Sequence, residues 1–407
     1  MKTFGLFVLC AGTLFAALIG GWSVMYRVAY VAFLLVFVGA VWTYVSVRTI
    51  DVVRRTRAQR AEVGGYFEEW VAVDNTWYLP KPWVELESGS NLAGHAVHRG
   101  FLLGPNARRS WTLRTQCTMR GKFTLGDIKV TTGDPFGLFQ RMVKFPSQEA
   151  IVVYPQTVDF TTPARIPGDL PGGARPSGYV PYMTPTAAGV REYAPSDPLS
   201  RIHWPSTARM GQLMVKEFEL DPFADIWIAL DLNRYVHHGR GPESTEEYAV
   251  TIAASLGKHF LMQNRSVGFL AQNELIHADR GSRQLTKFLE LLAVVRADRW
   301  ATMGQTLSGE SVRFSRLSTV VVVTPSTDTE WVGVCQHLTQ RRVNTLVALI
   351  ESSTFGSGVQ SIDVVGSLAV ANVPVYLVKR GEPLERLLAE PASQIANYTM
   401  RSGSHGV

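Results

Sequence analysis

The sequence predicts a mixed β and α/β protein with an apolar membrane segment, a β-sandwich and an α/β domain whose open sheet is mostly parallel. Three observations predict this fold class. Two long apolar runs precede residue 48, short alternating runs fill residues 61–160, and residues 220–380 alternate apolar strands with amphipathic helices. Because 407 residues are enough for two domains with separate cores, we expect each pattern to fold by itself.

Composition excludes several function classes. The formal net charge is +6, and the arginines gather just after the apolar runs, where they indicate membrane topology. We predict no nucleic-acid partner, because the chain has neither zinc-finger spacing nor the aromatic pattern of an RNA-binding sheet. It also lacks a phosphate-binding loop, and nothing indicates a small-molecule substrate. Three cysteines without a CxxC pair argue against a disulfide framework.

There are two apolar runs, Phe4–Ile19 and Val28–Val47, and Gly20–Ser23 between them predicts a turn. The second run has about the length that a bilayer requires, and the first is slightly short but can reach across with its flanks. A cleaved signal peptide is the alternative for the first run, but a second span follows at once. We therefore expect residues 1–60 to form an uncleaved transmembrane hairpin with a basic flank, in a multi-pass protein of the cell membrane.

Orientation follows from the basic flank of the second run. By the positive-inside rule this flank is cytoplasmic, so the bulk of the chain is expected to face the cytoplasm. The residues concerned are Arg48, Arg54, Arg55, Arg57 and Arg60.

Residues 61–160 read as a small antiparallel β-sandwich, because each alternating run is bounded by Pro, Gly, Asn or Asp. Gly133–Gly137 (GDPFG) is strong turn chemistry. His95 and His98 stand in a Gly-rich stretch without nearby ligands at metal spacing, so we expect a surface loop there and no metal site.

Residues 161–219 begin as a connector rich in proline and glycine and end in a stretch of mixed charges and aromatic rings. Three interpretations stay open for this stretch: an ion-pair and aromatic cluster that packs the connector onto the α/β domain, a docking surface for a partner protein, or a catalytic site. Catalysis lacks a convincing nucleophile beside His203. The candidate residues are Arg191, Glu192, Tyr193, Asp197, Arg201, His203, Trp204, Arg209, Lys216, Glu217 and Phe218.

In residues 220–380, apolar runs of strand length such as Ala224–Asp231 and Thr319–Thr324 alternate with helical patterns such as Ser244–Gln263. Sites in such sheets lie at the carboxyl ends of the strands, which draws attention to Asp231 and to residues 324–328. Residues 381–407 are expected to form a C-terminal tail.

The stretch REYAPSDPLSRIHWPSTARMGQLMVKEFE, from Arg191 to Glu219, resembles the signature of the bacterial domain of unknown function 58 family, with Ser196 where glycine is usual. RGKFTLGDIKVTTGDPFGLF and EAIVVYP resemble the same family's upstream segments. The resemblance implies a membrane hairpin, an immunoglobulin-like sandwich and a von Willebrand factor A-like α/β domain. It also implies partnership with a MoxR-type AAA+ ATPase, and it carries no established catalytic activity.

A von Willebrand factor A domain holds a divalent ion through D-x-S-x-S after its first strand. Here the loop reads Asp231-Leu232-Asn233-Arg234-Tyr235, so Asp231 and Asn233 are candidate ligands in a degenerate site, and Mg²⁺ is the one cofactor considered. The sequence therefore predicts a membrane-anchored scaffold or adaptor for a cytoplasmic ATPase, and not an enzyme. The alternative is a divalent-metal-dependent binding module or enzyme that uses the strand-end loops.

Overall fold

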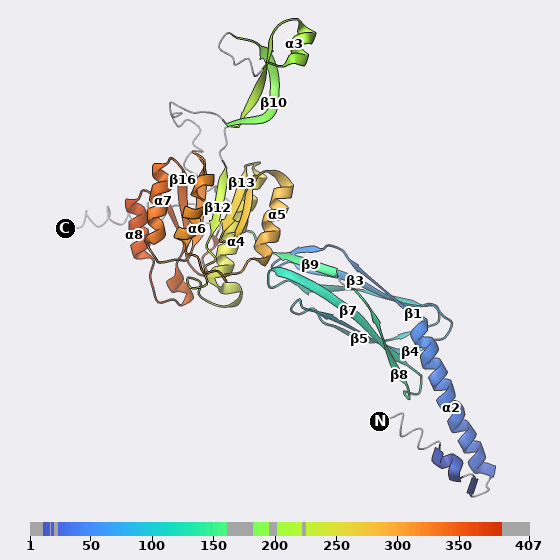
Figure 1. Cartoon of the computed structure of the whole chain (residues 1–407). Helices are drawn as coiled ribbons and strands as arrows, with labels where there is room; N and C mark the ends of the chain where they lie inside the picture. The colour runs from blue at the N-terminus through green and yellow to red at the C-terminus, as the bar shows by residue number, and fades with distance from the viewer. Residues whose placement is uncertain are drawn as a thin grey trace. The chain divides into compact units, whose positions relative to one another are not determined.

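The computed structural model describes residues 11–16, 18–19, 23–147, 149–160, 182–194, 202–221, 225–316 and 318–384. The chain divides into two compact units, Met1–Gln156 with Glu290–Val294, and Thr157–Leu289 with Val295–Val407 (Figure 1). In the first unit an apolar helix is followed in sequence by β-strands, and the second unit is an α/β unit. The predicted order of a β part followed by an α/β part is confirmed.

The apolar helix α2 (Ser23–Arg48) has the length and composition to cross a bilayer, and it is the one such helix among the described residues. Only 11% of its most apolar window is buried, although a signal sequence near an N-terminus would have the same length and composition. Residues 11–16 and 18–19 are helical as well. The rest of the first predicted span lies outside the described residues, so the two-span hairpin stays a prediction.

A buried lysine of the β-sheets binds the residue that follows the C-terminal end of α2. The ammonium of Lys81 donates hydrogen bonds to the carbonyl oxygen of Thr49, at 3.3 Å, and to its hydroxyl, at 3.1 Å. Asn75 Oδ1 accepts a third. A cation at a helix C-terminus interacts favourably with the exposed carbonyl groups there, so Lys81 caps α2 while belonging to the sheet beneath it.

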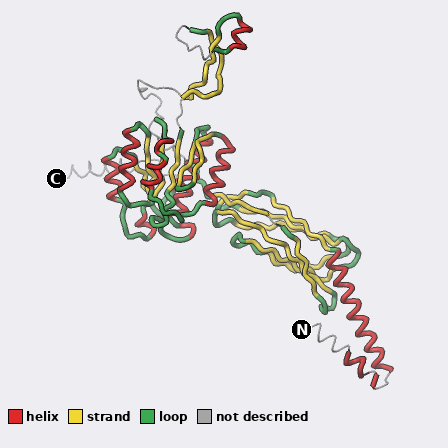
Figure 2. The backbone as a smooth tube through the Cα atoms, in the orientation of Figure 1, coloured by secondary structure: helices red, strands yellow, loops and turns green. Residues whose placement is uncertain are grey.

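The first unit is a β-sandwich of two sheets, coloured yellow in Figure 2. One sheet has the antiparallel order β1-β3-β6, and the other has the order β2-β9-β7-β4-β5, with β8 also paired to β7. The strands are β1 (Ile50–Thr56), β2 (Arg60–Glu62), β3 (Tyr66–Asn75), β4 (Lys81–Ser90), β5 (Val97–Leu103), β6 (Arg108–Gln116), β7 (Gly121–Gly133), β8 (Gln140–Phe145) and β9 (Glu149–Tyr154).

Alternating side chains of both sheets fill the space between them. Val71 and Val73 of β3 meet Val84 and Leu86 of β4 in one buried cluster, and Phe67 belongs to a second cluster nearer the other end of β3. This is the inward and outward alternation that predicted a sandwich, because successive side chains of a strand point to opposite faces.

The basic flank after α2, grouped with the membrane hairpin in residues 1–60, contains a strand that the sequence had not indicated. Residues 50–56 form β1, which pairs with β3 along its whole length. Arg54 is buried, and its guanidinium pairs with the buried carboxylate of Glu69 and donates to the carbonyl oxygen of Gly126 at 2.8 Å. Its charge therefore belongs to the sandwich interior and does not count toward the membrane orientation.

His95 was also predicted wrongly, as a surface residue. It is buried, with Nδ1 2.8 Å from the Thr115 hydroxyl and Nε2 2.8 Å from a Glu69 oxygen. Burial alone would raise the pKa of Glu69. The hydrogen bond from His95 and the charge of Arg54 outweigh burial and hold that pKa below its ordinary value.

The second unit contains one six-stranded sheet of order β14-β13-β12-β15-β16-β17, parallel except at the β14 edge. Its strands are β12 (Ile226–Leu230), β13 (Val267–Ala271), β14 (Glu274–Asp279), β15 (Thr319–Thr324), β16 (Asn344–Ile350) and β17 (Val375–Val378). Its helices are α4 (Thr245–Met262), α5 (Gly281–Val294), α6 (Met303–Gly309), α7 (Glu330–Gln340) and α8 (Ile362–Val370). The predicted helices and strands of residues 220–380 are confirmed apart from their ends, and α6 was missed.

Helices cover both faces of this sheet. Trp227 and Val320 pack with Trp331 of α7 and with side chains of α6 and α8 in one buried cluster. On the other face Phe269 of β13 packs edge-on against Phe288 of α5, at 5.5 Å between ring centroids. The chain order reverses between β12 and β15, which makes the carboxyl ends of these two strands the switch point where ligands of such sheets bind.

The charged and aromatic stretch forms a hairpin of its own. The strands β10 (Tyr182–Glu192) and β11 (Met214–Asp221) pair antiparallel, and the short helix α3 (Trp204–Met210) lies between them in sequence. Residues 182–188 had been predicted as extended connector, and the structure places them in β10. Pairing with β11 is what makes them a strand, and that partner is more than twenty residues away in the chain.

Candidate functional site

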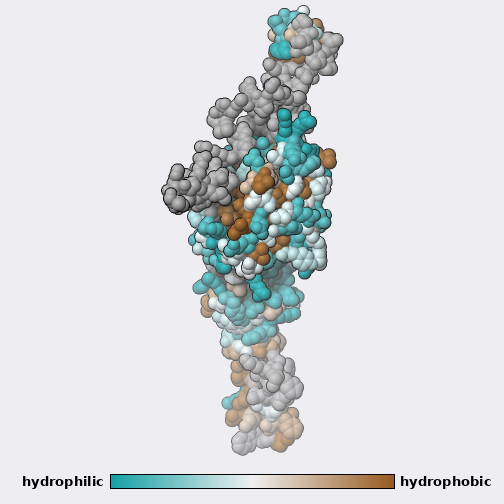
Figure 3. Space-filling view, turned by 90° about the vertical axis from the view of Figure 1, so that its left-hand side faces the viewer, coloured by the Kyte–Doolittle hydropathy of each residue, from teal (hydrophilic) through white to brown (hydrophobic). Residues whose placement is uncertain are grey.

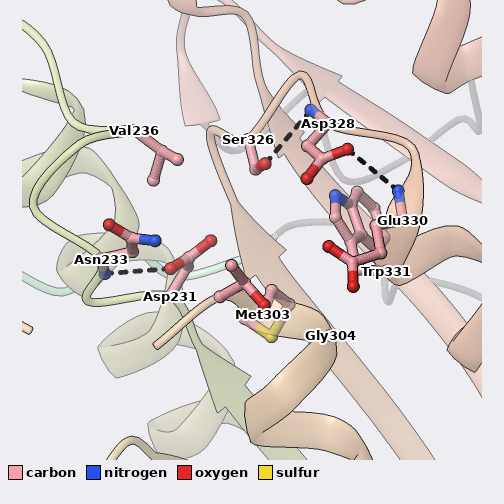
Figure 4. Close-up of a pocket in the computed structure, with 10 residues that line it drawn as sticks. Asp231, Asn233, Val236, Met303, Gly304, Ser326, Asp328, Glu330 and Trp331 are labelled. Carbon is pink, nitrogen blue, oxygen red and sulfur yellow. Dashed lines mark hydrogen bonds between the residues drawn. The ribbon is translucent and has the colours of Figure 1, made fainter. Parts of the chain in front are cut away.

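Two places in the second unit have features of a site: a cavity at the switch point of the sheet, and the hairpin that carries the signature residues. The cavity has a volume of about 90 Å³ and lies where β12 and β15 end side by side (Figure 4). It is lined by Asp231, Asn233, Val236, Thr302, Met303, Gly304, Ser326, Asp328, Glu330 and Trp331.

Asp231 is the most deeply placed polar residue of the cavity. One carboxylate oxygen accepts the backbone N–H of Asn233 at 3.0 Å, and the other accepts the hydroxyl of Thr324 at 2.6 Å. Burial raises the pKa of Asp231 above its ordinary value, and these two donors only partly oppose that rise. Both oxygens are thus already engaged by the protein.

The loop after Asp231 is held by its own hydrogen bonds. Asn233 Oδ1 accepts the backbone N–H of Tyr235 at 3.0 Å. His237 Nε2 lies 2.9 Å from the carbonyl oxygen of Asp231, and burial lowers the pKa of this imidazole. Because a carbonyl oxygen only accepts, the neutral ring carries its proton on Nε2 and donates it there.

The opposite wall of the cavity is equally occupied. The Ser326 hydroxyl accepts the N–H of Asp328 at 3.3 Å, and Asp328 accepts the N–H of Glu330 at 3.1 Å. Thr302 and Gln305 form a capping box at the start of α6. Sequence reasoning missed Thr302 as a cavity residue, although the T-x-x-Q spacing before α6 was the available signal.

These residues fit a magnesium ion poorly. Magnesium requires about six oxygen ligands in near-ideal octahedral geometry. Both oxygens of Asp231 and the amide oxygen of Asn233 are bound to protein donors instead. Within the described residues, no group of three or more His, Cys, Asp or Glu side chains is placed to hold a metal.

An exposed ring cluster stands beside the cavity. The guanidinium of Arg234 lies 4.6 Å from the ring centroid of Trp300 and 5.1 Å from that of Tyr235, and the two rings meet edge to face. Trp300 is 63% exposed. Tryptophan, tyrosine and arginine are the residues that most often dominate binding at protein interfaces. This cluster was not predicted, because Trp300 follows in sequence 66 residues after Arg234.

The hairpin brings together the described part of the signature. Arg191 pairs in register with Val215, and Glu192 with Met214. The Gln212 amide donates to a Glu192 carboxylate oxygen at 2.8 Å, and the backbone N–H of Tyr193 donates to Leu213 at 2.9 Å. Lys216, Glu217 and Phe218 belong to β11, whereas Asp197 and Arg201 lie outside the described residues.

His203 lies just before α3 and forms a local contact. Its Nδ1 is 2.7 Å from the hydroxyl of Ser206, and its backbone N–H donates to Met214 at 2.8 Å. Thr207 binds the N–H of Met214 through its hydroxyl at 3.0 Å. These bonds fasten α3 to β11 within the hairpin, so the described contacts of His203 are structural ones.

Apolar side chains of α3 are exposed in the part of the hairpin that the structure describes. None of the α3 residues is buried, and Trp204 is 66% exposed. Met210, Leu213 and Val190 are also exposed hydrophobic residues of the hairpin, and Arg209 is exposed beside them. Ile362 and Val370 of α8 are exposed hydrophobic residues as well. Figure 3 shows hydrophobic side chains, in brown, gathered on one face of the molecule.

Comparison with known proteins finds one family model that matches part of the hairpin and part of the α/β unit. The model of the DUF58 family, described as proteins of unknown function, matches residues 189–352. The Uncharacterized protein YeaD of Bacillus subtilis (strain 168) is 27% identical over 216 residues, which is 51% of this chain and 51% of YeaD. The chain thus matches about half the length of this curated relative.

Among solved structures, the CARDB domain of the PF1109 protein from Pyrococcus furiosus is 18% identical, with a TM-score of 0.19, over 26% of this chain and 91% of that one. The sporulation control protein Spo0M of Bacillus subtilis is 10% identical, with a TM-score of 0.18, over 26% of this chain and 49% of that one. Over residues 189–352, which include α3 and the switch-point cavity, the chain is thus similar to proteins of the DUF58 family.

Proposed function

We propose that this protein is a membrane-anchored scaffold or adaptor that binds a partner protein through the hairpin of β10, α3 and β11. The observation that carries the proposal is the exposure of Trp204 and Met210 on α3, a helix that buries none of its residues against the part of the chain that the structure describes. Exposed apolar side chains grouped on one small element, with a tryptophan among them, are typical of a binding surface.

The partner we propose is a cytoplasmic MoxR-type AAA+ ATPase. Support comes from the family resemblance and from the absence of a nucleotide-binding loop in this sequence, which leaves hydrolysis to another protein. Arg209 beside the apolar side chains adds a cation that favours an acidic rim on the partner. We propose no enzymatic activity for the chain itself.

Membrane anchorage is the second part of the proposal. It is supported by α2 and its exposed apolar side chains, and by the arginines that follow it. We propose a two-span hairpin with the folded units in the cytoplasm. The sandwich agrees with an immunoglobulin-like fold, and the strand order with a von Willebrand factor A-like domain.

Two tryptophans of almost equal exposure allow a matched test of the docking surface. Detergent extracts of cells that express the full chain with an affinity tag are purified, and co-purified ATPase is measured. We expect Trp204→Ala to reduce the ATPase at least about tenfold, since truncating an interface tryptophan typically costs about 2 kcal/mol or more. The control Trp300→Ala is to leave the yield unchanged.

Charge variants complete this experiment. Arg209→Glu and Lys216→Glu are expected to weaken the association without lowering the melting temperature of the chain. If Trp300→Ala removes the ATPase and Trp204→Ala does not, docking uses the strand-end loops and the hairpin assignment is wrong. If every variant co-purifies the ATPase as well as the unaltered chain does, neither the hairpin nor the strand-end loops bind it.

The alternative function is a divalent-metal-dependent binding module or enzyme. One observation favours it: Asp231, Asn233 and Ser326 line the same cavity at the switch point. The engaged oxygens of Asp231 and Asn233 oppose it, which is why docking is our first proposal. We expect millimolar Mg²⁺ to leave the melting temperature unchanged. A rise that Asp231→Ala abolishes would instead establish the metal-dependent function.

A further inference from the structure

We propose that the turn between β7 and β8, residues 133–140, contacts the lipid bilayer beside α2, so that the sandwich meets the membrane through a second element. This inference rests on the membrane anchorage proposed above and concerns the first unit alone. The occupant of this surface is the interfacial region of a lipid bilayer, where headgroups meet acyl chains.

The turn lies against α2 well before the helix ends. Gly39 of α2 is buried, and a Cβ atom placed on it would lie 3.3 Å from Cδ2 of Phe139 and 3.5 Å from the carboxyl group of Asp134. Gly39 precedes Arg48 by nine residues, which is roughly 14 Å along a helix at 1.5 Å per residue. Figure 1 shows the turn that joins β7 to β8 beside α2, below the helix's C-terminal end.

The length of α2 places this contact at the edge of the hydrocarbon layer. A bilayer core of about 30 Å is crossed by about 20 helical residues, and α2 has 26. Counted from Ser23, the hydrocarbon segment therefore ends near Trp42, one turn beyond Gly39. The turn that touches Gly39 consequently lies at the boundary between acyl chains and headgroups.

Three backbone N–H groups of the turn are hydrogen-bonded within the turn itself, as a low-polarity environment requires. The fully buried carboxylate of Asp134 accepts the backbone N–H groups of Phe136, at 2.9 Å, Leu138, at 3.2 Å, and Phe139. Gly137 has φ of +70°, a value that glycine adopts without strain and that closes the turn. Unpaired backbone groups are costly at membrane depth, and Asp134 satisfies three of them internally.

The side chains of the turn suit the interface. Phe136 is 55% exposed, and Pro135 is exposed beside it. Phenylalanine is among the apolar side chains that interfacial segments bury at the boundary between headgroups and acyl chains. Arg141 and Lys144 on β8 are exposed and follow directly, at a position where cations attract anionic lipid headgroups. The turn thus combines exposed apolar side chains, which can enter the interface, with nearby cations that can bind anionic headgroups.

The test compares the turn with the far end of the same sandwich. Met119 follows β6, whose last residue pairs with Tyr66, and it is 48% exposed. On β3, Tyr66 is nine positions before Asn75 at the α2 end, which is about 30 Å at 3.3 Å per residue. Phe136→Cys and Met119→Cys therefore form a matched pair, one at the proposed membrane side and one remote from it.

The full chain, with Cys10→Ser, is reconstituted in phosphatidylcholine and phosphatidylglycerol vesicles, and each introduced thiol receives an environment-sensitive fluorophore. Cys117 and Cys335 stay unlabelled because they are buried, which raises the pKa of both thiols. A third variant, Phe33→Cys in α2, is the reference for acyl-chain depth. Quenching by lipids that carry a nitroxide on the acyl chain is then measured for the three labels.

We expect a blue-shifted emission and nitroxide quenching for the Phe136→Cys label, and neither for the Met119→Cys label. Quenching of the Phe33→Cys label without quenching of the Phe136→Cys label would overturn the inference while anchorage stands. If the Phe33→Cys label is not quenched either, anchorage fails and the inference with it. A blue shift at Phe136→Cys without quenching would mean that protein covers the turn, which also overturns the proposal.

Discussion

Replacing Gly257 of α4 by alanine tests how closely α4 and α5 pack in the α/β unit. A Cβ atom at Gly257 would lie 2.7 and 2.8 Å from two ring atoms of Phe288, and closer still to a third. Phe288 is fully buried and packs edge-on against Phe269, so its ring has no free space to move into. The added methyl group must therefore displace packed side chains.

The magnitude follows from a comparison with Gly333 of α7, where an added Cβ meets nothing within 4 Å. Glycine to alanine inside a helix gains about 1 kcal/mol, and this gain is common to both variants. Overpacking a filled core costs about 1–3 kcal/mol, and only Gly257→Ala incurs it. Gly333→Ala should stabilise the unit, and Gly257→Ala should be about 1–3 kcal/mol less stable than Gly333→Ala.

A single buried thiol reports this unit alone. Cys335 is fully buried on α7, and burial raises its pKa to about 12, so it reacts with a fluorogenic maleimide only after the α/β unit opens. With Cys10→Ser and Cys117→Ala in the full chain, the two glycine variants are heated in detergent. We expect midpoints that differ by about 2–12 °C, at 2–4 °C per kcal/mol. Equal midpoints would refute the close packing of α4 on α5.

Two further predictions concern buried charges. Burial lowers the pKa of Lys81 from 10.5 to about 8, so the unfolded chain binds more protons between these values, and the stability of the sandwich should rise with pH from 8 to 10.5. Lys81→Met should remove that rise, and a pH-independent melting temperature of the unaltered chain in this window would contradict the assignment. Burial raises the pKa of Asp231, so its contribution to stability is lost as pH rises through the folded value. The difference in melting temperature between Asp231→Asn and the unaltered chain should therefore shift in favour of the variant as pH rises above the ordinary carboxyl range, and a shift in favour of the unaltered chain would show that the carboxylate is stabilised by its surroundings.

Local patterns predicted the elements whose residues carry their own signal. Thr319–Thr324 is a run of β-branched residues with the length of a buried strand, and the structure has the same bounds. The short helix α6 has seven residues and no strong periodicity, so its capping box was the only local signal. Short elements of this kind are fixed by their packing on Trp331 and its neighbours, which sequence alone does not show.

Contacts between distant residues account for what was missed in the sites. His95 is buried because Glu69 and Thr115, 26 and 20 residues away, offer it partners inside the sandwich. Arg54 was counted as a signal of membrane topology, because its partner Glu69 stands on another strand and the local sequence does not reveal the pair. In both cases the residue type suggested exposure. Burial depends instead on how the strands pair, which no local pattern encodes.

The match to the DUF58 family model covers only part of the chain. It begins at residue 189, inside β10, and ends at residue 352, just after β16, so it contains α3, the switch-point cavity and the Arg234 ring cluster. It leaves out α2 and the sandwich. If the hairpin binds the partner, the first unit needs only to hold it at the membrane, and the β7–β8 turn would fix the sandwich at the bilayer surface. The matched pair Trp204→Ala and Trp300→Ala then separates the two surfaces inside the family region, because each tryptophan stands on one of them and their exposure is nearly equal.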